Sequence, residues 1–134
     1  MNYNSTGYIE FRTLLANGAL PASDVNIRIT GSEEGNIGID YSIVTDKDGI
    51  SEVLSLPAPS RSYSLSPNGA EQAFANYDVE VFKDGYYAKT ITNVSIFDGI
   101  KSVLPIELIP NAKNDHLLTP NDNTVILTEN EDLS

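Results

Sequence analysis

The chain is dominated by apolar and polar residues that alternate with a period of two. In the first such stretch, Ile9 and Phe11 alternate with Glu10 and Arg12. Alternation of this kind is typical of strands with one face on a core and the other in water. The pattern predicts about seven strands once neighbouring segments merge. Their ranges are 7–15, 23–31, 37–45, 50–56, 77–83, 86–92, 93–97 and 102–109.

The inward positions of these strands define the predicted core. They are Ile9, Phe11, Val25, Ile27, Ile29, Val44, Leu54, Val79, Val81, Ile91, Val94, Ile96, Val103, Ile106 and Leu108. Charged residues at the alternate positions, such as Glu10, Asp78 and Glu80, are expected to lie in solvent because they fall on the opposite face.

Turn signals separate the strands. Asp84-Gly85 is a pair that tolerates the positive φ of a hairpin turn. Helix signals are nearly absent, apart from one short candidate at 68–76. The segment 56–76 is too long for a hairpin and is expected to cross between two sheets. Together these features predict an all-β sandwich.

The composition changes near residue 110. The strand pattern occupies residues 1–110, whereas 111–134 are rich in Asn, Asp, Thr and Glu. One strand-like patch, at 124–128, interrupts this polar segment. We therefore expect one sandwich domain over 1–110, followed by a polar acidic extension that contributes at most one edge strand.

Composition and charge exclude several classes of function. The 134 residues include 8 Lys+Arg and 19 Asp+Glu, for a formal net charge of −11. This charge argues against binding to nucleic acid or an anionic membrane, because both require clustered basic side chains. The absence of cysteine removes disulfides and thiol chemistry, and the single histidine removes any site with two His ligands. The chain shows no signal-peptide pattern and no stretch of about 18 apolar residues that would span a bilayer.

The segment DKDG at 46–49 is a candidate for calcium binding. On a tight turn, Asp46 and Asp48 would supply two of the hard oxygens that calcium requires. The full calcium-loop pattern fails, because Ile50 and Pro57 stand where further ligands are needed. The alternative is a hairpin turn in which aspartate caps backbone N–H groups and the glycine takes a positive φ.

Three tyrosines are candidates for stacking on a sugar ring or a peptide. Tyr63 lies in the loop rich in Pro and Ser, and Tyr86 and Tyr87 follow the Asp-Gly turn. Because adjacent strand residues face opposite sides, one member of the Tyr86–Tyr87 pair is expected to join the core. The alternative is a purely structural role for all three. The single histidine, His116, falls in the polar extension and is expected to be a solvated surface residue.

Five motifs occur in a recognisable order: GYIEF at 7–11, ALPASDVNI at 19–27, VTDKDG at 44–49, YDVEV at 77–81 and DGY at 84–86. This order resembles the carboxypeptidase regulatory-like, transthyretin-like β-sandwich family. Asp24 departs from the family pattern, which has a small residue there. The segments NVSIFDG at 93–99 and LPI at 104–106 are similar to the accessory domain of bacterial spore cortex-lytic enzymes. The resemblance covers residues 7–110.

The resemblance implies a non-catalytic accessory or binding module, and it supplies no catalytic residue. It suggests a protein of a spore-forming bacterium that is cytoplasmic or spore-associated, or that lies at the cell surface as part of a longer protein. The expected partners are another protein or a cell-wall glycan, and oligomers are expected if exposed sheet edges pair. No cofactor other than calcium is expected.

The sequence is also compatible with two rival functions. One is a calcium-dependent carbohydrate-binding module that uses Asp46 and Asp48 with Tyr63 or Tyr87. The other is a small glycan hydrolase that uses paired carboxylates, although 19 acids in 134 residues give such pairing little specificity.

Overall fold

The structure is a computed structural model that describes residues 3–15, 18–61 and 73–111. These residues contain eight strands and no α-helix, which confirms the predicted all-β class. The strands are β1 (Ser5–Leu15), β2 (Leu20–Pro21), β3 (Asn26–Thr30), β4 (Asp40–Val44), β5 (Leu54–Ala58), β6 (Phe74–Phe82), β7 (Lys89–Phe97) and β8 (Lys101–Glu107). In the described part of the chain, no helix is long and apolar enough to cross a membrane.

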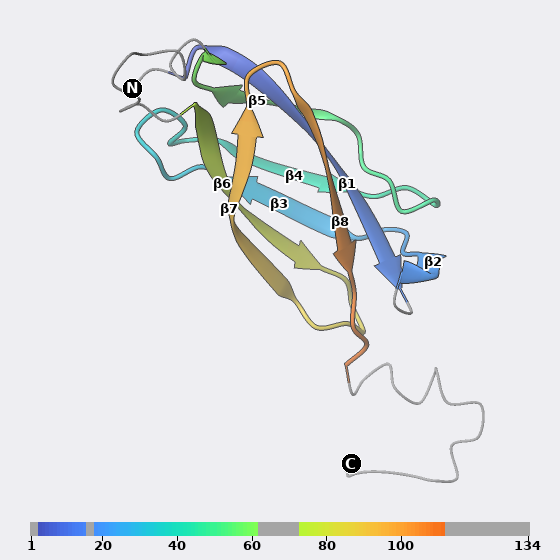
Figure 1. The fold of residues 1–134 in the computed structure, drawn as a ribbon. Coiled ribbons are helices and arrows are strands. Elements are labelled where there is room, and N and C mark those ends of the chain that lie inside the picture. The colour runs from blue at the N-terminus through green and yellow to red at the C-terminus, as the bar shows by residue number, and fades with distance from the viewer. Residues whose placement is uncertain (1–2, 16–17, 62–72, 112–134) are drawn as a thin grey trace, which may run out of the picture.

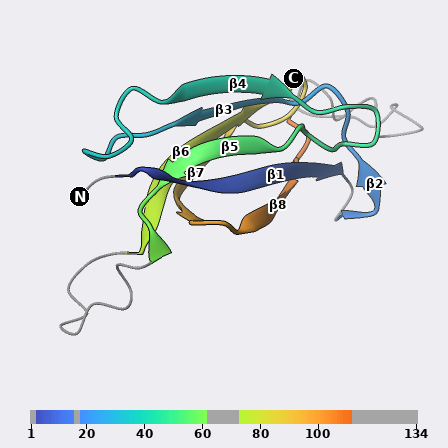
Figure 2. The same ribbon diagram turned by 90° about the horizontal axis from the view of Figure 1, so that it is seen from above.

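Two sheets form the layers of the sandwich (Figure 1). Sheet A is built around β1, which pairs in antiparallel fashion with β2 and β5 and in parallel fashion with β8. Sheet B has the order β4-β3-β6-β7, and all its pairs are antiparallel. Viewed from above, β3 and β4 lie on one side of the molecule and β1 and β8 on the other (Figure 2). The connection from β5 to β6 passes from sheet A to sheet B, as its length predicted.

The ends of several strands differ from the sequence prediction. β6 begins at Phe74, inside the segment where a short helix was the candidate. β5 begins at Leu54, because Ile50 forms only an isolated bridge with Arg12. The two segments predicted at 86–92 and 93–97 form the single strand β7. This strand bulges against β6 near Asn93, whose φ is 59°.

The core fills the space between the two sheets. Most of the predicted residues are buried, with Phe11 on β1 and Val79 on β6 both 0% exposed. The core also contains Tyr77, whose hydroxyl donates to the carbonyl oxygen of Pro57 at 2.6 Å. Burial raises the pKa of the Tyr77 phenol well above its ordinary value. This tyrosine therefore stays neutral and joins β6 of sheet B to β5 of sheet A.

Two predicted core residues, Val44 and Val103, are exposed instead. In β4, Ile43 is the inward residue and pairs with Ile27, so that Val44 turns outward and is 53% exposed. In β8, the inward set includes Ile106, which leaves Val103 on the outer face at 46% exposure. In each strand two adjacent residues are apolar, Ile43–Val44 and Val103–Leu104, and only one of each pair faces the core because successive side chains of a strand point to opposite faces.

Glu10 was expected in solvent but is buried on the outer face of sheet A. Its side chain lies between Lys101 and Arg12, with Oε1 at 2.9 Å from Lys101 Nζ and Oε2 at 2.8 Å from Arg12 Nε. The hydrogen bond from Lys101, with a second from Arg12, lowers the pKa of Glu10 below its ordinary value. The ion pair between this carboxylate and Lys101 therefore links β1 to β8.

A buried group of hydroxyls joins the two sheets at one end of the sandwich. Thr13 on β1 donates from Oγ1 to the carbonyl of Ala22 at 2.7 Å. Thr45, directly after β4, accepts from the amide of Val25 at 3.0 Å and lies 3.2 Å from Thr13, measured between Oγ1 atoms. Thr13 and Thr45 are 0% and 1% exposed. Their hydroxyls satisfy backbone groups that would otherwise be buried without partners.

Candidate binding surface

The outer face of sheet B carries a mixed row of side chains across three strands. Val44 on β4 pairs with Asn26 on β3, and Asn26 pairs in turn with Phe82 on β6. Val44 and Phe82 are each 53% exposed. Both residues point outward because their neighbours in sequence, Ile43 and Val81, occupy the core positions. The sheet therefore presents two apolar side chains to solvent with an amide side chain between them.

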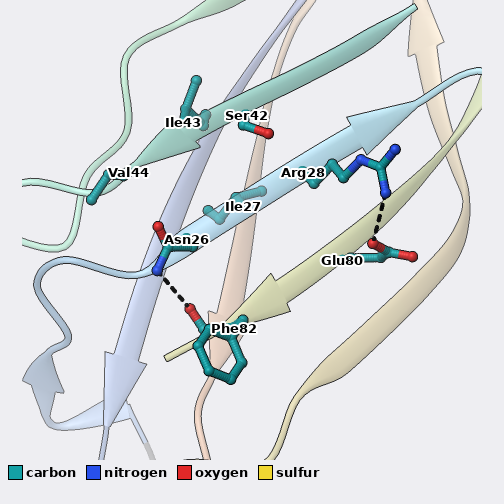
Figure 3. A pocket seen from close by; sticks show the side chains of 8 residues that line it. All are labelled: Asn26, Ile27, Arg28, Ser42, Ile43, Val44, Glu80 and Phe82. Atoms are coloured by element: carbon teal, nitrogen blue, oxygen red, sulfur yellow. Dashed lines mark hydrogen bonds and ion pairs between the residues drawn. The ribbon is translucent and has the colours of Figure 1, made fainter. Parts of the chain in front are cut away.

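A shallow groove follows this row and continues toward the row formed by Ser42, Arg28 and Glu80 (Figure 3). It has a cavity volume of about 240 Å³. Its lining residues are Asn26, Ile27, Arg28, Ser42, Ile43, Val44, Glu80 and Phe82. Because pockets for small ligands are usually about 300–1,000 Å³, this groove is better suited to contact with part of a larger partner. We call this surface the sheet B groove.

Arg28 forms ion pairs with two acidic residues at the sheet B groove, Asp40 and Glu80. Its guanidinium makes a two-point contact with Asp40, at 3.0 Å from Nε to Oδ1 and 2.7 Å from Nη2 to Oδ2. A third contact runs from Nη1 to Glu80 Oε1 at 3.6 Å (Figure 3). Together these contacts link β3 to both neighbouring strands. These hydrogen bonds, which Arg28 donates and Asp40 accepts, lower the pKa of Asp40 and raise the pKa of Arg28. Asp40 and Arg28 are therefore both ionised near neutral pH.

The proposed calcium residues form a capped turn. One carboxylate oxygen of Asp46, Oδ1, accepts from the amides of Asp48 at 2.9 Å and Ile50 at 3.0 Å. Gly49 has a φ of 76°, and its amide donates to the carbonyl of Asp46 at 2.9 Å. These are the contacts that the hairpin-turn alternative predicts. Within the described ranges, no group of three or more His, Cys, Asp or Glu side chains is placed to hold a metal ion.

The tyrosine candidates occupy different environments. Tyr86 is half-buried and packs against the core, whereas Tyr87 is 60% exposed, as expected for neighbours that face opposite sides. The amide of Tyr87 donates to the carbonyl of Ile109 at 2.9 Å, and Ile109 is itself exposed. Tyr63 and His116 lie outside the described residues. No hydrogen bond or ion pair within the described chain joins Tyr86 or Tyr87 to the turn at 46–49.

The sequence prediction missed the sheet B groove as a site. Alternation places Asn26 and Arg28 on the outer face of their strand. What alternation alone does not provide is the register that sets Arg28 opposite Glu80 and Ser42. The signal that could have indicated this face is one outward arginine on a strand whose neighbours carry outward acids.

Comparison with known proteins supports the fold. No family model matches the sequence, and comparison with curated proteins finds no match. Among solved structures, the chain is similar to the TIE protein of Bacillus anthracis, with a TM-score of 0.51 and 18% identity over 79% of this chain. It is also similar to catechol 1,2-dioxygenase from Acinetobacter radioresistens, with a TM-score of 0.57 and 11% identity over 92% of this chain.

These similarities concern a part of each larger protein. The chain spans 17% of the TIE protein and 57% of the Acinetobacter dioxygenase. Catechol 1,2-dioxygenase from Pseudomonas arvilla C-1 gives a similar result, with a TM-score of 0.56, 13% identity over 86% of this chain, and 55% of its own length covered. At these identities the likeness shows a shared sandwich fold.

Proposed function

We propose that this chain is a non-catalytic accessory module that recognises a protein or a cell-wall glycan through the sheet B groove. The observation that carries the proposal is the pairing of Arg28 with Asp40 and Glu80 beside the exposed Val44 and Phe82. Fixed charges next to exposed apolar groups are typical of recognition surfaces. In contrast, catalytic acids and bases usually have pKa values shifted toward the working pH, and Asp40 is shifted the other way.

One structural neighbour, the TIE protein, favours an accessory role. In the TIE protein a sandwich like this one occupies a small part of the chain, 17%, whereas in the Acinetobacter dioxygenase it occupies 57%. Such a domain supplies a rigid frame on which binding surfaces vary. The resemblance to the accessory domain of spore cortex-lytic enzymes leads to the same proposal, and it adds a spore-forming bacterium as the source and a spore-associated or cell-surface location.

A turnover assay separates this proposal from an enzymatic function. The full chain is incubated with peptidoglycan sacculi, model glycans and catechol, and the release of reducing ends or the loss of catechol is measured. We expect no turnover above the blank. Turnover by the wild-type chain that is lost in Glu80→Gln and retained in Thr90→Ala, which changes an exposed residue on the neighbouring strand β7, would overturn the proposal. Co-sedimentation with sacculi in the same samples measures glycan binding directly.

A further inference from the structure

The four edges of the two sheets are not equally protected. β5 contains Pro57 and β8 contains Pro105. Proline has no backbone N–H and is a common device that prevents a further strand from pairing with an edge. β4, with the sequence DYSIV, contains no proline. This edge therefore has a complete set of backbone donors.

The opposite edge of sheet B, β7, contacts the end of sheet A where it begins and bulges further along its length. Lys89 of β7 donates from Nζ to the carbonyl of Glu107 at 2.7 Å. The amide of Tyr87, just before β7, donates to the carbonyl of Ile109 at 2.9 Å. β7 is also distorted by the bulge near Asn93. These features leave β4 as the sheet B edge that is open to a partner, and four of its five residues are exposed.

The direction of the free backbone groups of β4 follows from the contacts at its two ends. The amide of Thr45 donates to Val25 at 3.0 Å, and Ile39 accepts from the amide of Gly31 at 3.0 Å. Backbone groups alternate sides along a strand, and the register between β3 and β4 is unbroken. The residues that direct both N–H and C=O to the open edge are therefore Asp40, Ser42 and Val44.

The side chains of these same residues lie on the outer face. An added antiparallel strand would place one residue opposite each of them, at about 4.5–5.5 Å between β-carbons. An apolar residue suits Val44, a hydroxyl suits Ser42, and a basic residue suits Asp40. The residues between them would pack beside Ile43 and Tyr41, which face the other side. From its N-terminus, the matching segment therefore has an apolar residue opposite Val44, a hydroxyl residue opposite Ser42 and a basic residue opposite Asp40. The two residues between these positions are apolar.

From this geometry we propose that β4 is a docking edge for an extended basic segment of another protein, which joins sheet B as an additional strand. The inference rests on the proposed binding function and names the partner's chemistry. Charge favours this partner, because the net charge of −11 attracts a basic chain. A second copy fits less well. Antiparallel self-pairing centred on Ser42 would set Asp40 opposite Val44 twice, and the two copies would repel each other.

Binding of a designed peptide tests the proposal. The probe is the labelled peptide acetyl-VITVKK-amide, titrated into the full chain at low salt and followed by fluorescence anisotropy. Saturable binding is expected, and it should weaken as salt rises. The charge-reversed peptide acetyl-VITVEE-amide should bind at least about tenfold more weakly, because its carboxylates meet Asp40 and the net charge of −11 with like charge.

Matched N-methylation shows whether the peptide binds as a strand. The amide of its threonine would face Ser42, whereas the amide of its isoleucine would point away from β4. N-methylation of the threonine should weaken binding at least about tenfold, and N-methylation of the isoleucine should change it by less than about threefold. This pair leaves the protein unaltered, so that the result does not depend on how a variant folds.

Variants of the protein provide the complementary test. Ser42→Pro removes the donor at the centre of the open edge and should abolish binding, whereas Ser42→Ala keeps the donor and should retain it. The proposal is overturned if no peptide binds, if both N-methylated peptides lose affinity equally, or if sedimentation shows a dimer that Ser42→Pro dissociates. Loss of peptide binding without turnover would leave the non-catalytic proposal standing, whereas turnover would overturn that proposal whatever the peptides do.

Discussion

Thr13 and Gly49 approach each other so closely that a β-carbon on residue 49 would lie 2.5 Å from the carbonyl oxygen of Thr13. The amide of Thr13 donates to the carbonyl of Gly49 at 2.8 Å, which draws the turn at 46–49 against β1. Gly49 also has a φ of 76°, in the left-handed region. Position 49 therefore requires glycine for two independent reasons.

Replacement of Gly49 by alanine should therefore destabilise the fold strongly. We expect Gly49→Ala to lower the free energy of unfolding by at least about 2 kcal/mol, from backbone strain and from the clash with Thr13. Gly38→Ala is the matched control, because Gly38 has a φ of 97° but no atom within 4 Å of the added β-carbon. It should cost only about 1–2 kcal/mol. Urea denaturation measures both, and equal losses would contradict the role of the close contact.

Thr45→Val tests the hydroxyl contacts between the sheets. The substitution keeps the shape of the side chain but leaves the amide of Val25 without its partner at 3.0 Å. We expect a loss of about 1–3 kcal/mol in the free energy of unfolding. Thr90→Val, at an exposed position on β7, serves as the control and should change stability by less than about 0.5 kcal/mol. Similar effects of the two substitutions would show that the buried hydroxyl contributes little.

The register of β4 predicts that alanine substitutions at two adjacent residues change the stability of the fold by very different amounts. Ile43→Ala removes a buried side chain and should cost about 2–4 kcal/mol. Val44→Ala changes a side chain that is 53% exposed and should cost less than about 0.5 kcal/mol. Thermal or chemical denaturation of the pair checks the assignment, and the reverse order would show that the strand is shifted by one residue.

The ion pairs of Glu10 predict a pH dependence of stability. The folded state holds the pKa of Glu10 below its ordinary value, so that on acidification the unfolded chain takes up the proton first. The stabilisation is therefore complete above the unfolded pKa, and it is lost as the pH falls through the folded pKa. Wild type should be more stable than Glu10→Gln at pH 7, and this advantage should shrink below about pH 4.

Denaturation midpoints of both proteins across this pH range measure the effect. Glu52→Gln is a suitable control, because Glu52 is an exposed carboxylate on the loop before β5. Its difference from wild type should be small at every pH. A constant difference between wild type and Glu10→Gln from neutral to acidic pH would show that the charge of Glu10 does not stabilise the fold.

Asp46 offers a test that separates a capped turn from a calcium site. Asp46→Asn keeps an oxygen that accepts from the amides of Asp48 and Ile50, and it should retain stability. Asp46→Ala loses both hydrogen bonds and should cost about 1–3 kcal/mol. Calcium titration of wild type should leave the melting temperature unchanged. A calcium-dependent rise that Asp46→Asn abolishes would establish the metal site instead.

The sequence predicted the positions of the strands better than it predicted which of their residues face the core. A period of two was sufficient to identify the strand that carries Ile27 and Ile29, because only alternate residues there are apolar. In β4, however, Ile43 and Val44 are both apolar, so that the local pattern did not decide which one faces the core. The pairing of Ile43 with Ile27 decides it, and that contact joins two strands.

The candidate site was less predictable for a related reason. Asp46 and Asp48 were recognisable because their spacing is local, and the structure places them in a local turn. The sheet B groove depends on Arg28 reaching acids on two other strands, which requires the register of three strands. Glu10 shows the same limit, since its burial depends on Lys101, near the other end of the described chain.

The parallel pair of β1 and β8 has a consequence for how the chain is made. β1 leaves the ribosome before the other described strands, yet one of its sides acquires a partner only when β8 emerges. Until then, the central strand of sheet A has an unpaired row of amides, and Glu10 lacks the ammonium group of Lys101. Contacts so distant in sequence form slowly. During synthesis, the pairing of β1 with β8 is therefore the last contact of β1 with the described strands to form.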